Sequence, residues 1–319
     1  MIEVEERCNL DCSFCFNKNT FAKEGRNINN KLSNEYVKKI IDDAVDSGLF
    51  ALRFTGGEPL MREDIWDLAE YAVKKNVKLC LNTNGLLIGS IHIAERISSM
   101  FENVLISLQY KDFVGINPSA RQKIKAIKLL KKTGTQILRI GSVATFDLIN
   151  NLEKFHEIIY SLNVDDWELY RELSFEMKRT VSSFSRKSVK KLVNKLLKIN
   201  IEFGKTYKIA NALPFCSYDP AIVSQVCLGA EAVDGHIRFA IDPRGFAKPF
   251  YYFEENIGNP LDLKSCWNSD FMIKMRNLEF TPRECKDCIF LEKCKGGCRF
   301  SAKITYGSYD SPDPLMHKK

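Results

Sequence analysis

Short apolar runs alternate with amphipathic stretches along the first two thirds of the chain. The runs predict buried strands at residues 2–6, 50–54, 77–81, 103–108, 136–144 and 167–170. The stretches between them have apolar residues at helical spacing and predict helices at residues 34–47, 63–75, 91–100, 119–132, 152–162 and 185–200. This alternation favours a parallel sheet covered by helices. Six repeats are too few to close a complete barrel, so we expect an α/β fold with a partial, TIM-like (β/α)6 barrel.

The pattern changes after about residue 206. Helical periodicity weakens, cysteine, glycine and proline become more frequent, and residues 243–245 separate two short apolar runs as in a hairpin. We therefore expect two domains, a barrel over residues 1–206 and a small cysteine-rich α+β domain over residues 207–319.

Composition and charge narrow the class of protein. No apolar stretch is long enough to span a membrane, and the N-terminus lacks the basic and apolar regions of a secretory signal, so we expect a cytoplasmic protein. The net charge of +7 is modest, and the lysines at 187–198 fit the solvated face of a helix. This pattern disfavours a nucleic-acid partner.

The eleven cysteines are clustered. Three fall at residues 8–15 and four at residues 285–298. In a reducing compartment such clusters indicate metal binding rather than disulfides. The four histidines lie away from both clusters, which favours ligation by thiolates alone.

Cys8, Cys12 and Cys15 form a CxxxCxxC motif directly after the first predicted strand. Three thiolates on one loop can hold three irons of a 4Fe–4S cubane and leave the fourth iron open to a small molecule. A zinc site would need a fourth cysteine or histidine nearby, and this stretch of sequence offers none.

Polar motifs follow the next three predicted strands. They are Thr-Gly-Gly-Glu-Pro at 55–59, Asn-Thr-Asn-Gly at 82–85 and Ser-Leu-Gln at 107–109. Barrel enzymes place their chemistry at the carboxyl ends of strands, so we expect these motifs beside the cysteine loop. Gly56 and Gly57 would let the backbone approach a ligand, and Glu58 offers a carboxylate to an ammonium group.

These residues resemble the radical S-adenosylmethionine (SAM) superfamily over about residues 2–170. The resemblance rests on Cys8–Cys15, with Phe14 before the third cysteine, and on Gly56–Pro59. It implies that Cys8, Cys12 and Cys15 ligate a 4Fe–4S cluster whose fourth iron binds SAM. The SAM contacts that it implies are Gly56, Gly57 and Glu58 at the methionine amino group, Phe14 near the adenine, and Asn84 and Ser107 at strand ends. Many relatives have the sequence Ser-Leu-Asp-Gly at the end of the fourth strand. This chain has Gln109 and Tyr110 in place of the aspartate and the glycine, and the change affects the local contact with the ribose or the substrate.

Cys285, Cys288, Cys294 and Cys298 follow a CxxCx5Cx3C spacing. With Cys227 and the Asp-Pro-Arg-Gly at 242–245, they resemble the SPASM extension of radical SAM enzymes, which carries auxiliary 4Fe–4S clusters, over about residues 213–316. The resemblance extends the fold expectation to a SPASM/twitch-like second domain.

The number of auxiliary clusters stays open between one and two. Relatives usually have cysteines where this chain has Phe250 and Met316. The family pattern implies one cluster at Cys285, Cys288 and Cys294 and another at Cys227 and Cys298, with Cys216 as a further candidate ligand of the second. The alternatives are a single cluster on Cys285, Cys288, Cys294 and Cys298, or a structural zinc there.

The resemblance implies a radical SAM oxidoreductase or maturase. A flavodoxin- or ferredoxin-type reductant would supply an electron, SAM would be cleaved to a 5′-deoxyadenosyl radical, and the radical would abstract hydrogen from a substrate carbon. By analogy with SPASM-containing relatives the substrate is a peptide or protein. A small molecule, such as a tetrapyrrole or quinone cofactor precursor, is the alternative. Only seven residues precede Cys8, so we expect either a separate protein or the surface of the barrel to bind any leader peptide.

Two other classes of protein compete with this interpretation. A non-catalytic iron–sulfur electron carrier would not need the motif at 56–58, and a calorimetric test of SAM binding would distinguish it from a radical SAM enzyme. A nucleic-acid-binding protein with cysteine knuckles would show a basic, aromatic-interleaved element, which we do not find in the sequence.

Overall fold

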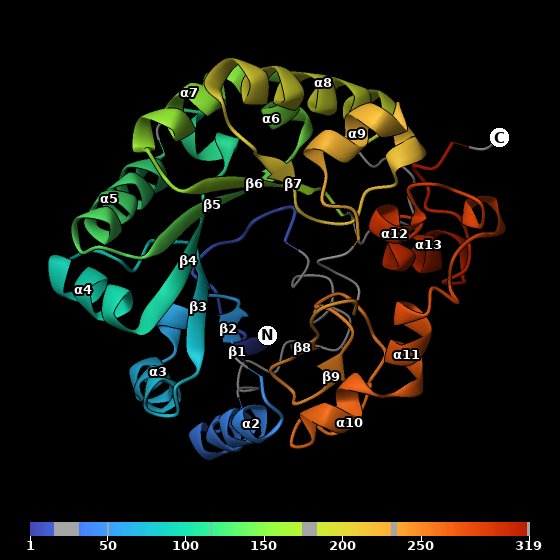
Figure 1. Ribbon diagram of the computed structural model, residues 1–319. Coiled ribbons are helices and arrows are strands. Elements are labelled where there is room, and N and C mark those ends of the chain that lie inside the picture. Colours follow the sequence, from blue (N-terminus) through green and yellow to red (C-terminus); the bar gives the residue numbers. More distant parts are fainter. Residues whose placement is uncertain (16–31, 50, 116, 174–183, 231–234, 318–319) are drawn as a thin grey trace. The chain divides into compact units, whose positions relative to one another are not determined.

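The computed structural model describes residues 1–15, 32–49, 51–115, 117–173, 184–230 and 235–317 (Figure 1). Contacts divide the chain into two compact units. The first contains Met1–Gly141, Leu162–Asp166 and Phe239–Ser269, and the second contains Ser142–Ser161, Trp167–Arg238 and Asp270–Lys319. These units are defined by contacts, and the division into domains at residue 206 stays a prediction.

The described part of the first unit is built on a largely parallel sheet with the order β5-β4-β3-β2-β1-β8-β9. Neighbouring strands pair in parallel from β1 to β5, β8 pairs parallel to β1, and β9 pairs antiparallel to β8. The strands are β1 (Ile2–Glu5), β2 (Ala51–Gly56), β3 (Lys78–Thr83), β4 (Phe101–Ser107), β5 (Ile137–Ala144), β8 (Ala240–Ile241) and β9 (Ala247–Lys248). The predicted hairpin is therefore present, although its strands are only two residues long.

Helices follow the parallel strands, and Figure 1 shows α2 to α5 along one side of β1 to β5. The elements are α2 (Asn34–Asp46), η1 (Pro59–Met61), α3 (Ile65–Lys74), α4 (Ile91–Met100), η2 (Tyr110–Phe113), α5 (Pro118–Lys132) and α10 (Leu263–Trp267). Capping residues fix several helix starts, because the side chains of Ser33, Ser90 and Asn117 each accept a backbone N–H of the first turn.

Alternation along β1 separates an apolar from a polar set of buried side chains. Ile2 and Val4 are fully buried, and so are the carboxylates of Glu3 and Glu5 at the alternate positions. Lys248 and Asp242 form a buried ion pair of 3.0 Å close to Glu3. Burial is the main cause that raises the pKa of Glu3 to about 8, while the nearby positive charge of Lys248 lowers it.

The second unit contains the parallel pair β6 (Asp166–Arg171) and β7 (Lys208–Ile209). Its helical elements are α6 (Phe146–Asn150), α7 (Leu152–Leu162), α8 (Arg186–Phe203), η3 (Phe215–Ser217), α9 (Pro220–Val226), α11 (Asp270–Arg276), η4 (Arg283–Cys285), α12 (Leu291–Cys294) and α13 (Arg299–Tyr306). Trp167 is fully buried among the rings of Phe155, His156 and Tyr207.

The fold prediction is confirmed at the level of class, a mixed α/β protein with a largely parallel sheet. The short helix α6 was not predicted, because five residues are too few to show a helical period. Among the described residues, no helix is both long and apolar enough to cross a membrane.

Candidate functional site

The cysteine motif forms a loop directly after β1. The backbone N–H of Cys15 donates to the carbonyl of Cys12 at 3.1 Å, and the N–H of Leu10 donates to Cys8 Sγ at 3.4 Å. Cys8 is exposed, Cys12 and Cys15 are half-buried, and all three are free thiols. This short turn carries all three cysteines within one stretch of eight residues.

Gly56 and Gly57 hold this loop by close backbone contact. The N–H of Gly57 donates to the carbonyl of Glu5 at 2.7 Å, and the N–H of Glu58 donates to the carbonyl of Arg7 at 2.8 Å. A Cβ atom at residue 56 would lie 2.1 Å from the Glu5 oxygen, and one at residue 57 would lie 2.2 Å from the Arg7 oxygen. The two glycines therefore fix the end of β1, from which the cysteine loop departs.

Glu58 is fully buried and joins the loops that follow β2 and β3. Its Oε1 accepts hydrogen bonds from the Thr83 hydroxyl at 2.7 Å and the Leu60 N–H at 3.1 Å, and its Oε2 accepts the Asn84 N–H at 2.7 Å. Burial raises the pKa of Glu58, and these hydrogen bonds partly oppose the shift by lowering it. The carboxylate thus positions Asn84, and the hydroxyl of Thr83, the neighbouring residue of the same motif, helps to hold the carboxylate.

Asn84 reaches the cysteine loop, in agreement with its predicted place at a strand end. Its Nδ2 lies 2.7 Å from Asn9 Oδ1 and 3.9 Å from Cys8 Sγ, and its Oδ1 accepts the N–H of Leu86. The structure therefore brings Asn84, Glu58 and Cys8 together through direct contacts.

Ser107 is the last residue of β4, and it is hydrogen-bonded by Gln109, the residue that departs from the family pattern. Gln109 Nε2 donates to Ser107 Oγ at 3.0 Å and to the carbonyl of Gly141 at 3.3 Å. The glutamine is buried, so its amide crosslinks the ends of β4 and β5 instead of bringing a charge to the site.

A lysine that was not predicted lies beside the cysteine loop. Lys111 Nζ is 4.7 Å from the ring centroid of Phe14. Burial raises the pKa of Cys12, and the positive charge of Lys111 partly opposes this shift by lowering it. The neighbouring Asp112 is buried, pairs with Lys123 Nζ at 2.7 Å and accepts the N–H of Gln109 at 2.9 Å. Asp112 and Lys123 lie on different elements, so no local sequence pattern indicates their pairing.

The residues present fit a three-thiolate iron–sulfur site. Burial is the largest cause of the raised pKa of Cys8. The other two thiols, Cys15 and Cys12, are close enough for their charges to raise this pKa further. The Leu10 N–H directed at Cys8 Sγ is the kind of donor that stabilises a ligating thiolate. Among the described residues, no three His, Cys, Asp or Glu side chains converge on the position of a single metal ion.

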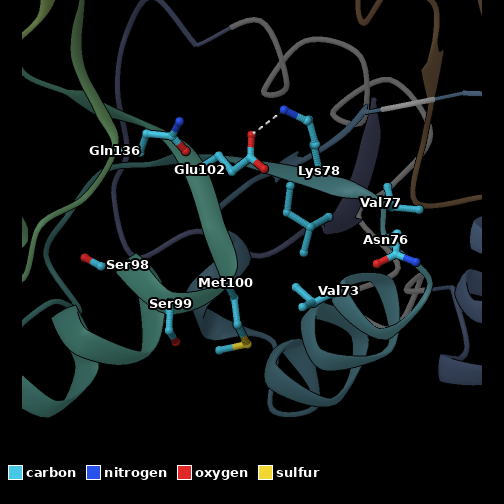
Figure 2. Close-up of a pocket in the computed structure, with 10 residues that line it drawn as sticks. Val73, Asn76, Val77, Lys78, Ser98, Ser99, Met100, Glu102 and Gln136 are labelled. Atoms are coloured by element: carbon cyan, nitrogen blue, oxygen red, sulfur yellow. Dashed lines mark ion pairs between the residues drawn. The ribbon is translucent and has the colours of Figure 1, made fainter.

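The pocket shown in Figure 2 lies at the opposite ends of the strands. It has a volume of about 430 Å³ and is lined by residues that include Lys78, which begins β3, and Met100 and Glu102 around the start of β4. Lys78 and Glu102 form an ion pair of 3.2 Å beside it. Barrel enzymes carry their chemistry at the carboxyl ends of strands, so we do not assign this pocket to the active site.

The C-terminal cysteines belong to the second unit. Cys227, Cys285, Cys294 and Cys298 are buried, Cys216 is half-buried and Cys288 is exposed, all as free thiols. Burial is the largest cause that raises the pKa of Cys285 and Cys227 to about 12 and that of Cys294 to about 11.

The two positions where relatives usually have cysteines are packed by other side chains. Phe250, in the first unit, is buried and stacks near the rings of Tyr251 and Tyr252. Met316, in the second unit, is buried, and its Sδ accepts the N–H of Asp313 at 3.3 Å.

Residues 2–159 match the Radical SAM superfamily. This span contains the cysteine loop, the glycine pair, Glu58, Asn84 and Ser107, and the chain therefore belongs to the radical SAM superfamily of enzymes. Its cysteine-rich C-terminal region is consistent with a SPASM-type extension.

Relatives of known activity match nearly the whole chain. The chain is 24% identical over 345 residues to the AdoMet-dependent heme synthase of Oleidesulfovibrio alaskensis, covering 98% of this chain and 85% of that protein. It is 24% identical over 338 residues to the PqqA peptide cyclase of Granulibacter bethesdensis, with the same coverage.

Solved structures share the fold. Native anSMEcpe with bound AdoMet has a TM-score of 0.75 at 19% identity, over 98% of this chain and 92% of that chain. Streptococcus suis SuiB bound to precursor peptide SuiA has a TM-score of 0.75 at 18% identity, over 99% of this chain and 75% of that chain.

Proposed function

We propose that this radical SAM enzyme cleaves SAM at the Cys8–Cys15 loop and uses the resulting radical to abstract hydrogen from a carbon of a peptide or protein, as a peptide maturase. The observation that carries the peptide assignment is the similarity to a PqqA peptide cyclase over 98% of the chain, which includes the cysteine-rich C-terminal region. SuiB, which was solved with its precursor peptide, has the same fold over nearly the whole chain.

Cys8, Cys12 and Cys15 are the proposed cluster ligands, and their neighbours hold the loop in place. When bound, a 4Fe–4S cluster supplies the single electron that splits SAM into methionine and the 5′-deoxyadenosyl radical. Gly56 and Gly57 fix the start of the loop through the carbonyls of Glu5 and Arg7. A flavodoxin- or ferredoxin-type donor is the proposed source of the electron.

The proposed SAM contacts surround this loop. We assign the backbone at Gly56 and Gly57, together with Glu58, to the methionine amino group, because they lie where the loops after β1 and β2 meet. Phe14 is assigned to the adenine, and Asn84 and Ser107 to contacts at the strand ends. Glu58 has a second task, since its carboxylate holds the backbone of Asn84 in place.

A SPASM-type region would add one or two auxiliary clusters on the C-terminal cysteines, and a separate protein would present a leader peptide where one is needed. We place the enzyme in the cytoplasm, where free cysteines and a low-potential reductant coexist. The second candidate substrate class is a tetrapyrrole or another cofactor precursor, which the similarity to a heme synthase supports.

The test is an anaerobic assay of 5′-deoxyadenosine formation with dithionite and SAM. The reconstituted wild type should form 5′-deoxyadenosine, and Cys12→Ala should form none while remaining folded. Absence of product from the iron-loaded wild type would overturn the proposal of SAM cleavage.

Two probes then separate the substrate classes. One is a pool of synthetic peptides that together present every side chain, and the other is a porphyrin that carries propionate groups. We expect the peptide pool to raise 5′-deoxyadenosine formation and to yield a peptide with a changed mass. A rise with the porphyrin and none with the peptides would replace the peptide proposal by the second candidate.

A further inference from the structure

We propose that Cys216, Cys285, Cys288 and Cys294 form a single four-thiolate site for one 4Fe–4S cluster, and that Cys227 and Cys298 lie outside its ligand set. The inference rests on the proposed function and deepens it, because it names the ligands of the auxiliary cluster. It differs from the family pattern, in which Cys216 would accompany Cys227 and Cys298.

Three of the four thiols come from one tightly turned segment. Successive turns fold it, since the N–H of Cys288 donates to the carbonyl of Cys285 at 3.1 Å and the N–H of Leu291 donates to that of Cys288 at 2.9 Å. The one-turn helix α12 then ends at Cys294, where the N–H of Gly297 donates to its carbonyl at 3.0 Å. A 4Fe–4S cubane takes four thiolates, so this segment needs one more sulfur.

The turn η3, which contains Cys216, packs directly on this segment. The N–H of Phe215 donates to Cys294 Sγ at 3.4 Å, and the Phe215 ring lies 5.9 Å, edge-on, from the ring of Phe290. A Cβ atom at Gly297 would lie 3.0 Å from Cβ of Pro214, so the side chain of Pro214 packs closely against the backbone at Gly297. Cys216 is therefore held next to Cys294 by the two residues that precede it, one of which donates an N–H···S hydrogen bond to Cys294.

The Cys216 thiol lies beside the segment that follows α13. A backbone hydrogen bond from His317 reaches this thiol. His317 directly follows Met316, so the sulfur of Cys216 lies beside the position where relatives usually have a further cysteine.

Cys298 and Cys227 have other local environments. Cys298 is the N-cap of α13, where its Sγ accepts the N–H of Ser301 at 3.4 Å and its own N–H donates to Asp313. Cys227 is fully buried, and its Sγ accepts the N–H of Gly229, whose backbone lies against the carbonyl of Lys293. Phe250, at a position of a usual ligand of a second cluster, is an aromatic side chain packed on Tyr252. The second unit has six cysteines, two fewer than a pair of four-thiolate clusters needs, and this favours one auxiliary cluster over two.

The experiment counts iron in a background that lacks the N-terminal cluster. Cys8, Cys12 and Cys15 are all replaced by alanine, the full-length chain is reconstituted anaerobically, and iron, sulfide and zinc are measured per chain together with the Mössbauer spectrum. We expect about four irons in this background. Adding Cys216→Ala or Cys288→Ala should remove most of that iron. Cys298→Ala, Cys227→Ala and the control Cys80→Ala, a half-buried cysteine of β3, should keep it.

Each other outcome overturns the inference in a defined way. Retention of iron in Cys216→Ala with loss in Cys298→Ala would assign the fourth ligand to Cys298. About eight irons in the background would mean two auxiliary clusters. Zinc in place of iron would mean a structural zinc site. Circular dichroism checks that Cys216→Ala is folded, and Cys216→Ser is a second variant with a smaller change.

Failure of this inference is distinguishable from failure of the proposed function. Iron in the background that lacks the N-terminal cysteines reports the four-thiolate site, and SAM cleavage by the wild type reports the proposed function. If the wild type never cleaves SAM, the proposed function fails even when the four-thiolate site is present.

Discussion

Replacing Gly57 by alanine should displace the cysteine loop, and the structure gives the size of the effect. The new Cβ atom would lie 2.2 Å from the Arg7 carbonyl oxygen, roughly 1 Å short of ordinary van der Waals contact. The obstacle is backbone, so relief requires the end of β1 to move away from residue 57. That movement breaks the hydrogen bonds Gly57 N–Glu5 O and Glu58 N–Arg7 O. Each hydrogen bond contributes about 0.5–1.5 kcal/mol net, and Gly57 is half-buried while Arg7 is exposed, so we expect the free energy of unfolding to fall by about 1–3 kcal/mol.

The matched control is Gly89→Ala. Gly89 needs no positive φ, and a Cβ atom there would meet only Gln122 Nε2 at 3.6 Å, which is an ordinary contact. Urea unfolding followed by circular dichroism measures stability, and the rate of SAM cleavage reports the loop. We expect Gly57→Ala to unfold at lower urea and to lose most SAM cleavage, whereas Gly89→Ala stays close to wild type. If Gly57→Ala matched the control in both measurements, the close backbone contact would not be what positions the cysteine loop.

Three further predictions use other contacts of the first unit. Glu58→Gln replaces one accepting oxygen by an amide NH2 group, which cannot accept the N–H of Asn84. Urea unfolding should therefore show a free energy of unfolding that is lower by about 1–3 kcal/mol. An unchanged urea midpoint would contradict this prediction. Glu3 has a folded pKa of about 8 against an ordinary value of 4.5, so the folded protein keeps a proton that the unfolded chain has released between these pH values. The contribution of Glu3 to the free energy of unfolding should therefore be complete below pH 4.5 and fall as the pH rises toward 8, by at most about 1.4 kcal/mol per pH unit. Glu3→Gln should flatten this pH dependence. Parallel curves of unfolding free energy against pH for the two proteins would refute the assignment. Lys111→Met removes a positive charge near Cys12, so it should make the reduction potential of the N-terminal cluster more negative in an EPR-monitored titration. Lys111→Arg keeps the charge and should leave the potential unchanged. Equal potentials for the two variants would show that the charge has no effect.

Local sequence patterns determined most of the fold and the outline of the site. The helix that begins after Ser33 was predictable because an N-cap side chain and an apolar stripe both act within a few residues. The cysteine loop was predictable for the same reason, since its three cysteines lie within eight residues of sequence. Asn84 was predictable because parallel strands bring their carboxyl ends to one edge of a sheet, and its contact with Asn9 and Cys8 agrees with that rule.

Only the tertiary structure decided which distant groups meet. Nothing local to Asp112 indicates that Lys123 will neutralise it, or that Lys111 will lie over Phe14, because those pairs depend on how α5 and the cysteine loop pack around the end of β4. The same holds for Cys216, which the family pattern groups with Cys227 and Cys298. Its neighbours are set by a turn that packs against Cys294, 78 positions further along the chain. Spacing in sequence fixes contacts within one loop, whereas contacts between loops follow from the packing of the elements that carry them.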